Sequence, residues 1–293
     1  TDKVLPDENR MINGFTDYEE LTRTRRLIMR SYKLPGNRLR LLHTNENRGA
    51  VTIDEERDYH FRYVLEDNFG NRRTYQFIVK GKRQDIPEYK PEANEMLYWN
   101  QTNVIQKPGM ELVVPRYYVY EDVPLRTDMR GDSSRIAFDY ILDAGRTPIH
   151  SYCDLSIGLR HMPVADTTKY YIVQKAGKWR SSMGGKYASG WIKTRVRSLG
   201  TFSVDVDTIA PQITPIGQGG WRTSRNIRFR IKDMESGIGS YKVYIDGKFV
   251  LFGLKKGILV IQDPEKVKKG VPHKLEVTVT DPCGNMARKE YKF

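Results

Sequence analysis

Two segments of this chain, residues 58–79 and residues 272–293, share one pattern, and this repeat constrains the fold more than any other feature. Each contains an Asp-x-x-Gly-Asn element, at residues 67–71 and 281–285, between two runs in which apolar and polar residues alternate. An Asp side chain accepts hydrogen bonds from the amides that follow it, and Gly or Asn adopts the positive φ that tight turns need. Alternation with period two is typical of strands. Each segment therefore predicts a β-hairpin.

The second copy of the repeat is preceded by further short strands. Asp207-Thr-Ile-Ala-Pro211 is typical of an interdomain junction, and Asp246-Gly247 predicts another tight turn. The apolar runs between them lie at residues 227–231, 241–245, 249–252 and 258–261. Short strands at this spacing are typical of a sandwich with about seven strands. We predict an immunoglobulin-like β-sandwich over residues 208–293.

The first copy of the repeat lacks such strands. Residues 17–33 have an acidic first turn and apolar residues at helical spacing before a Pro-Gly pair, which predicts a helix. Nothing in residues 1–57 matches the strand pair ahead of the second hairpin. Either the helix replaces those strands or the domain begins upstream of Thr1, and we favour the second interpretation. We expect residues 1–85 to form an immunoglobulin-like β domain truncated at its N-terminus, with one sheet edge unpaired or covered by the helix.

A different β-rich segment separates the two copies. It begins within a proline-containing stretch at residues 84–91 and spans residues 86–207. Its apolar and aromatic runs predict strands near residues 112–114, 117–120, 136–141, 170–173, 190–192 and 199–206. The overall prediction is an all-β chain of tandem immunoglobulin-like β-sandwich domains with one helical insertion near the N-terminus.

Composition excludes several classes of protein. Hydrophobic residues make up 39% of the 293, yet no apolar run approaches the roughly 20 residues of a membrane span. Basic and acidic residues are interleaved despite the net charge of +13, unlike a disordered basic tail. Two cysteines are too few for a disulfide-rich scaffold or a cysteine-built zinc site. We expect a folded chain with no transmembrane segment.

The chain contains no recognisable enzyme motif. Its five histidines form no His-x-His or His-Glu-x-x-His pattern, and no Walker A or Gly-x-Ser-x-Gly element occurs. His150 and Asp154 have the spacing of a ligand pair, with Cys153 and His161 as the remaining candidates nearby. A zinc site needs at least three convergent protein ligands, so we interpret this segment as a strand with alternating faces.

The two turn aspartates are a second candidate metal site. Asp67 and Asp281 each give one carboxylate to a turn, whereas Ca²⁺ takes about six to eight oxygen ligands. We therefore interpret both turns as structural. Cys283 occupies the place that Phe69 holds in the first copy, so its thiol is not part of the motif. No catalytic residue, metal ligand or cofactor is predicted within this chain.

Charge and aromatic residues give two candidate binding sites. The C-terminal domain has 16 basic and 8 acidic residues, and Arg228, Arg230 and Lys232 alternate with apolar neighbours, which places them on one strand face. Such a face attracts polyanions, although a solvated face is the simpler interpretation. Glycine-rich turns beside Tyr187 and Trp191 make these rings the candidate glycan-binding residues, although packing of the rings beside an ordinary hairpin turn is the simpler interpretation. No nucleic-acid-binding motif is present, so nucleic acid is not expected as a partner.

Several separated motifs, in the same order along the chain, resemble one family. They are Phe15-Thr-Asp-Tyr-Glu-Glu20, residues 48–59, the Asp67 turn, Asn103-Val-Ile-Gln-Lys-Pro-Gly109, Gly184-Gly-Lys-Tyr187 with Gly190-Trp-Ile192, Leu199-Gly-Thr-Phe202 with Val206-Asp-Thr208, and the closing hairpin. Together they resemble the C-terminal accessory β-domains of lysostaphin-type zinc metallopeptidases from Gram-negative gut bacteria. The resemblance spans essentially the whole chain and implies an exported, peptidoglycan-hydrolase-like parent protein.

The resemblance also implies where the chemistry of such a protein lies. The family's catalytic domain is upstream and holds zinc through a His-x-x-x-Asp pair and a later His-x-His. Neither maps onto this chain, because no His-x-His exists and His150 and Asp154 lie in an all-β segment. Zinc is therefore expected only in the missing peptidase domain. The family's first sandwich has a strand pair ahead of the part that matches residues 13–17, which supports truncation.

The sequence thus predicts the non-catalytic β-sandwich region of an exported metallopeptidase of the periplasm or outer cell envelope. Its expected role is to position or shield the upstream peptidase domain, or to bind peptidoglycan, another envelope polymer or a partner. The alternative is a free-standing surface adhesin or glycan-binding protein built from the same sandwiches. A His-x-His-bearing domain encoded upstream of Thr1 would separate the two.

Overall fold

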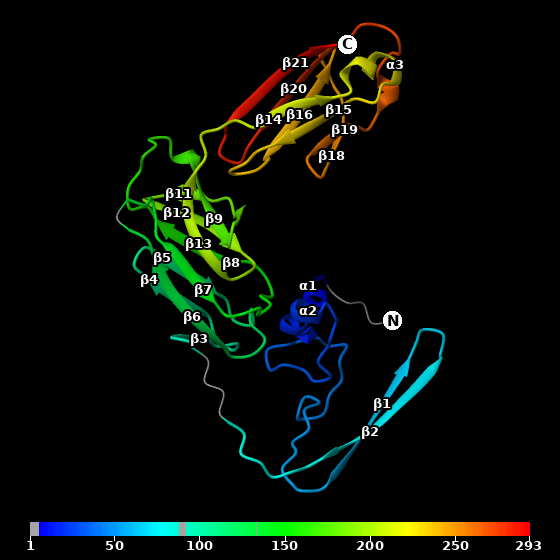
Figure 1. Cartoon of the computed structure of the whole chain (residues 1–293), viewed down its shortest axis with the longest axis vertical. Coiled ribbons are helices and arrows are strands. Elements are labelled where there is room, and N and C mark those ends of the chain that lie inside the picture. The colour runs from blue at the N-terminus through cyan, green and yellow to red at the C-terminus, as the bar shows by residue number, and fades with distance from the viewer. Residues whose placement is uncertain (1–5, 88–91, 133) are drawn as a thin grey trace. The chain divides into compact units, whose positions relative to one another are not determined.

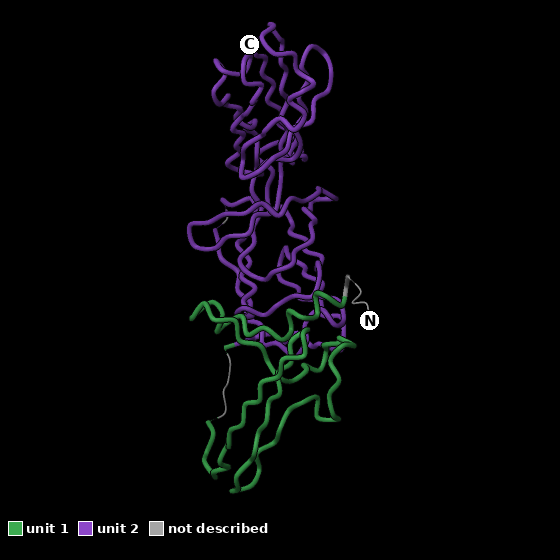
Figure 2. The backbone as a smooth tube through the Cα atoms, turned by 90° about the vertical axis from the view of Figure 1, so that its right-hand side faces the viewer, with its two compact units in different colours: residues 1–92 green, residues 93–293 purple. Residues whose placement is uncertain are grey.

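The computed structural model describes residues 6–87, 92–132 and 134–293, so part of the predicted linker at residues 84–91 lies outside the described residues. The chain divides into two compact units, residues 1–92 and 93–293, which are described separately (Figure 2). Most of the ordered elements are antiparallel strands, and the fold is all-β with helices near the N-terminus (Figure 1). No helix among the described residues is long and apolar enough to span a membrane.

Unit 1 begins with short helices. They are α1 (Pro6–Met11), the 3-10 helix η1 (Ile12–Phe15) and α2 (Tyr18–Thr24). Asp17 caps α2 by accepting a hydrogen bond from the amide of Glu20 at 2.9 Å, as the acidic start of the segment predicts.

The predicted helix over residues 17–33 is too long, because α2 ends where Arg25 adopts a left-handed φ of 62°. The chain then folds back, and Met29 forms a β-bridge with Thr16. Two backbone hydrogen bonds hold this return, from the Asp17 amide to the Ile28 carbonyl at 2.9 Å and from the Arg30 amide to the Phe15 carbonyl at 2.7 Å. Helical spacing alone did not reveal this competing pairing.

The rest of unit 1 is dominated by one hairpin. Strands β1 (Asp58–Glu66) and β2 (Arg72–Lys80) pair in antiparallel register with Phe61 opposite Phe77, and they form a two-stranded sheet. Within the described residues of unit 1 there is no second sheet, and two short segments that contain several apolar residues, 39–42 and 51–53, form no strand. The hairpin is as predicted, and whether it belongs to a truncated immunoglobulin-like domain stays a prediction.

The first part of unit 2, called the middle domain below, consists of two facing sheets. The first has the order β10-β9-β13-β7-β6-β3 and the second β11-β12-β8-β5-β4. The strands of the first are β3 (Glu95–Leu97), β6 (Val123–Arg130), β7 (Asp139–Asp143), β9 (Tyr170–Ala176), β10 (Trp179–Ser182) and β13 (Gly200–Val206). Those of the second are β4 (Asn103–Lys107), β5 (Met110–Val114), β8 (Cys153–Gly158), β11 (Lys186–Ala188) and β12 (Trp191–Val196).

The inward residues of both sheets form one core. Leu112, Leu155 and Phe202, among others, have no exposed surface, as the alternation along their strands requires. The predicted strand at residues 117–120 is wrong: these residues form a loop, in which Tyr117 has a φ of +68°. A strand cannot continue through that conformation.

The C-terminal sandwich also has two sheets, ordered β14-β15-β19-β18 and β17-β16-β20-β21. Their strands are β14 (Gln212–Ile216), β15 (Arg228–Lys232), β16 (Ser240–Ile245), β17 (Lys248–Phe249), β18 (Phe252–Lys255), β19 (Ile258–Ile261), β20 (Lys274–Thr280) and β21 (Met286–Lys292). Short helical turns complete unit 2: η2 (Thr167–Lys169), η3 (Gln218–Gly220), α3 (Trp221–Ser224) and η4 (Pro264–Lys266).

An aromatic cluster fills the core of this sandwich. Trp221 is fully buried, and its ring lies 5.0 Å from that of Phe229 and 5.7 Å from that of Phe293. The turn at Asp246 and Gly247 has φ values of 50° and 76°, the left-handed pair of a two-residue hairpin. Both the sandwich and this turn were predicted from the sequence.

Candidate functional site

The second Asp-x-x-Gly-Asn turn lies where the C-terminal sandwich meets the middle domain. Within the turn, one carboxylate oxygen of Asp281 accepts a hydrogen bond from the Asn285 amide at 2.9 Å, and the other accepts one from the Asn285 side chain at 2.8 Å. Gly284 supplies the positive φ of 80°. The predicted turn chemistry is therefore present, and it fixes the Asn285 side chain in one orientation.

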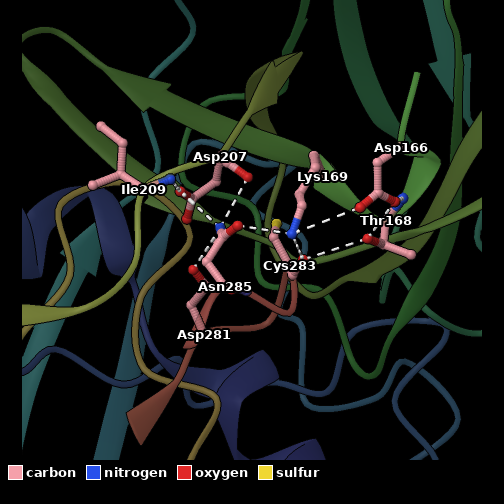
Figure 3. A network of polar contacts seen from close by, with 8 residues as sticks. All are labelled: Asp166, Thr168, Lys169, Asp207, Ile209, Asp281, Cys283 and Asn285. Carbon is pink, nitrogen blue, oxygen red and sulfur yellow. Dashed lines mark hydrogen bonds and ion pairs between the residues drawn. The ribbon is translucent and has the colours of Figure 1, made fainter. Parts of the chain in front are cut away.

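Asn285 and its neighbours in the turn also bond across the junction (Figure 3). Lys169, from the middle domain, donates to the Asn285 side-chain oxygen at 2.7 Å and to the Cys283 carbonyl at 3.0 Å. The Asn285 side-chain nitrogen donates to the backbone carbonyl of Asp207, the residue that follows β13, at 3.0 Å. One five-residue turn thus carries polar contacts to Asp207, directly after the last strand of the preceding domain, and to Lys169 of η2.

Asp207 is the residue through which the two domains are joined. It has no exposed surface. Its backbone amide donates to the Lys169 carbonyl at 2.9 Å, on the side of the middle domain. One of its carboxylate oxygens accepts hydrogen bonds from the amide and hydroxyl of Ser236, in the C-terminal sandwich, at 3.0 Å and 2.5 Å. The linker is thereby tied to both domains.

Cys283 provides the apolar part of the junction. It is 2% exposed and packs with Tyr171 and Val173 of β9. Burial raises the pKa of its thiol to about 11, so the thiolate needed for nucleophilic chemistry is scarce at neutral pH. The side chain acts here as a small apolar contact.

Three carboxylates converge beside this junction. Asp207, Asp233 and Asp281 bring oxygen atoms within 4.8 Å of one another, and among the described residues they are the one such group of potential ligands. Burial raises the pKa of Asp233, and the neighbouring carboxylates of Asp207 and Asp281 add to the effect. Counting one carboxylate per turn missed this convergence, because the three residues come from separate segments.

An all-oxygen group of this kind has the donor chemistry of a Ca²⁺ site. The carboxylates, however, already accept hydrogen bonds from the chain. Asp233 accepts from the amides of Glu235 and Gly237 at 3.0 Å and 2.8 Å, and Asp207 and Asp281 are bonded as described above. These amide donors account for the arrangement of the cluster, and we assign no metal to it.

Arg228, Arg230 and Lys232 lie where the sequence predicts, side by side on the outer face of β15. All three are exposed, while Phe229 and Ile231 between them are buried. We call these three residues, with Lys255 of β18, the cationic face. None of the four forms an ion pair with any residue that the structure describes.

The two candidate glycan-binding aromatics do not share a surface. Tyr187 lies opposite Ile192, and Ala188 lies opposite Trp191, in the β11–β12 pair. Residues directly opposite share a face and successive residues alternate, so the two rings are on opposite faces of the hairpin. Trp191 packs against Gly158, and its ring is only partly exposed. The two rings therefore do not form one shared surface, and glycan binding by either residue stays a prediction.

The other candidates from the histidine segment are structural. His150 is 5% exposed, and its Nδ1 lies 2.9 Å from the Tyr120 hydroxyl. Cys153 points into the core, where burial raises its pKa to about 12, while Asp154 faces outward on the same strand. His150 is thus buried in the segment before β8, whereas Asp154 is exposed on that strand.

Comparison with known proteins gives one family match. Residues 94–207, which include every strand of the middle domain, match the family model of the Zu5-like domain. No curated protein sequence matches the chain. A solved structure described as a "Ca2+-stabilized adhesin" that "helps an Antarctic bacterium reach out and bind ice" aligns over 80% of each chain, at 10% identity and a TM-score of 0.20. A TM-score this low does not establish a shared fold.

Proposed function

We propose that this chain is the non-catalytic β-domain region of an exported cell-envelope protein, and that its Zu5-like middle domain and C-terminal sandwich act as one rigid pair. The pair would position a peptidase domain encoded upstream, as the ordered motifs shared with lysostaphin-type metallopeptidases imply. The observation that best supports the rigid pair is the junction at Asp207, where buried hydrogen bonds join the two domains.

The physical argument rests on the cost of separating these groups. Lys169 is only 16% exposed in its side chain, and Asp207 is fully buried, so swinging the domains apart would exchange their hydrogen bonds for bonds to water. The net loss is about 1.5–3 kcal/mol for each hydrogen bond to a charged group. A linker that is bonded on both sides therefore transmits orientation, which is what a positioning region requires.

The experiment compares two equivalent asparagines by calorimetry of the full chain. Asn285→Ala removes the two junction contacts of this side chain, with Lys169 and with the Asp207 carbonyl. Asn71→Ala, its matched control, removes the same side chain from the first turn, where among the described residues it bonds only to Asp67. We expect Asn285→Ala to lower the melting temperature of unit 2 and to split its unfolding into two transitions. Lys169→Met should act in the same direction. Equal behaviour of Asn285→Ala and Asn71→Ala would refute the rigid pair.

The non-catalytic part of the proposal has its own test. Incubated with purified peptidoglycan sacculi, the full chain should release no muropeptides, with or without added zinc. Release of muropeptides that is lost in His150→Ala would place an active site within these residues. A gene that encodes no His-x-His-bearing domain upstream of Thr1 would favour a free-standing adhesin or glycan-binding protein instead.

A further inference from the structure

We propose that the cationic face of the C-terminal sandwich binds an anionic polysaccharide of the cell envelope; this inference rests on the proposed location of the protein. The face belongs to the sheet β14-β15-β19-β18. Arg228, Arg230 and Lys232 point outward from one strand, spaced by roughly 6.8 Å, which is twice the rise per residue.

The two sheets of this sandwich differ in whether their cations have carboxylate partners on the same sheet. On the outer side of β20 and β21, Lys274 pairs with Glu290 at 3.1 Å and Arg288 pairs with Glu276 at 2.5 Å. The strands β14, β15, β18 and β19 contain no acidic residue at all. The sheet β17-β16-β20-β21 thus pairs two of its cations with its own carboxylates, whereas the sheet β14-β15-β19-β18 has no carboxylate to pair with its cations.

The neighbours of the cationic face are uncharged. Across β15, Arg228 lies opposite Ile216 and Val260, and Arg230 lies opposite Thr214 and Ile258. Lys255 follows on β18, opposite Ile258. With no carboxylate among these positions, the field of the cations is not cancelled locally.

The shape and chemistry of this face favour one kind of partner. A row of evenly spaced cations on a flat sheet suits a polymer with repeated negative charges better than a single small anion, which would need an enclosed site. The face carries no aromatic side chain on which bases could stack, unlike surfaces that bind single-stranded nucleic acids. Aliphatic side chains between the cations can lie against sugar rings. These features favour a charged polysaccharide.

The test measures retention of the full chain on immobilised heparin, used as a model anionic polysaccharide, and on purified sacculi. Retention on both should fall steeply between about 50 mM and about 500 mM NaCl, because exposed charges are screened within about 10 Å at 0.1 M salt. Arg228→Glu with Arg230→Glu should weaken binding about tenfold or more at the lower salt concentration. Both positions are exposed, so circular dichroism and the melting temperature should stay unchanged.

The matched control reverses two cations on the other sheet. Lys242→Glu with Lys292→Glu changes the net charge by the same amount at exposed positions of β16 and β21, and it should leave retention within about twofold of wild type. Equal losses in both double variants would reduce the effect to net charge and overturn the proposal. Tighter binding to duplex DNA or to anionic lipid vesicles than to both glycans would also overturn it. The junction variants Asn285→Ala and Lys169→Met should bind normally, so a failure here is distinct from a failure of the rigid pair.

Discussion

The hairpins β1–β2 and β20–β21 have the same turn in different surroundings. In both, the Asp carboxylate accepts a hydrogen bond from the Asn amide four residues on, at 3.0 Å for Asp67 and 2.9 Å for Asp281. In both, the Asn side chain donates to the other carboxylate oxygen at 2.8 Å. The φ values of Gly70 and Gly284 are 83° and 80°. Five consecutive residues are enough to specify this turn.

The two hairpins differ in what packs over their strands. On β20, the inward residues Val277 and Val279 have no exposed surface, because the facing sheet packs over them. On β1 the corresponding positions hold Tyr63 and Leu65, which are 41% and 57% exposed. The turns diverge too, since Phe69 is 91% exposed whereas Cys283 packs on the middle domain. A local motif therefore sets the shape of a hairpin, and its context decides whether it becomes core, junction or surface.

The largest expected effect comes from replacing one leucine with alanine in each hairpin. This pair of substitutions tests the difference in burial between the two hairpins. Leu275 is fully buried on β20, and Leu275→Ala should destabilise the C-terminal sandwich by about 2–5 kcal/mol because it leaves a cavity. Leu65→Ala, on the exposed face of β1, should cost under about 0.5 kcal/mol. Chemical denaturation of the full chain, followed by hydrogen exchange in each hairpin, measures both. A cost for Leu65→Ala as large as that for Leu275→Ala would mean that the face of β1 is covered in solution.

A smaller and equal effect is expected at the two turn glycines. A Cβ at Gly70 or Gly284 meets no atom within 4 Å, so the cost of Ala comes from the positive φ alone. We expect Gly70→Ala and Gly284→Ala each to cost about 1 kcal/mol, measured by the same denaturation and exchange experiments. Unequal costs would show that the surroundings, and not only the local backbone, hold the second turn.

The smallest expected effect is a pH dependence of stability, which has opposite signs for Asp67 and Asp233. Hydrogen bonds from Asn71 and Phe69 lower the pKa of Asp67, so this stabilisation is present above the unfolded pKa of about 3.9 and is lost as the pH falls through the lower folded value. Burial raises the pKa of Asp233, so its unfavourable contribution grows as the pH rises through its folded value and is relieved in acid. NMR titration of the Asn71 and Gly237 amides measures both. Loss of order around Asp67 and around Asp233 over the same acidic range would contradict the opposite signs.

The parts of the fold that were predicted correctly depend on short-range patterns. The alternation of Arg228, Phe229 and Arg230 predicted strand β15 and its exposed cations, because successive side chains of a strand point to opposite faces of the sheet. Errors arose where another part of the chain competed with the local pattern. The helix ends at Arg25 because the following residues pair with Thr16. The loop at residues 117–120 replaces a predicted strand because Tyr117 has a positive φ.

The sequence by itself determined the two Asp-x-x-Gly-Asn turns, the all-β class and the cationic strand, since each depends on residues within a few positions of one another. Only the tertiary structure decided which turn became a junction. Asp207, Asp233 and Asp281 meet, and Lys169 reaches Asn285, because two folded domains pack against each other. Contacts between residues far apart in the chain follow from how whole sheets bury their apolar faces. A local sequence pattern does not indicate how those sheets pack.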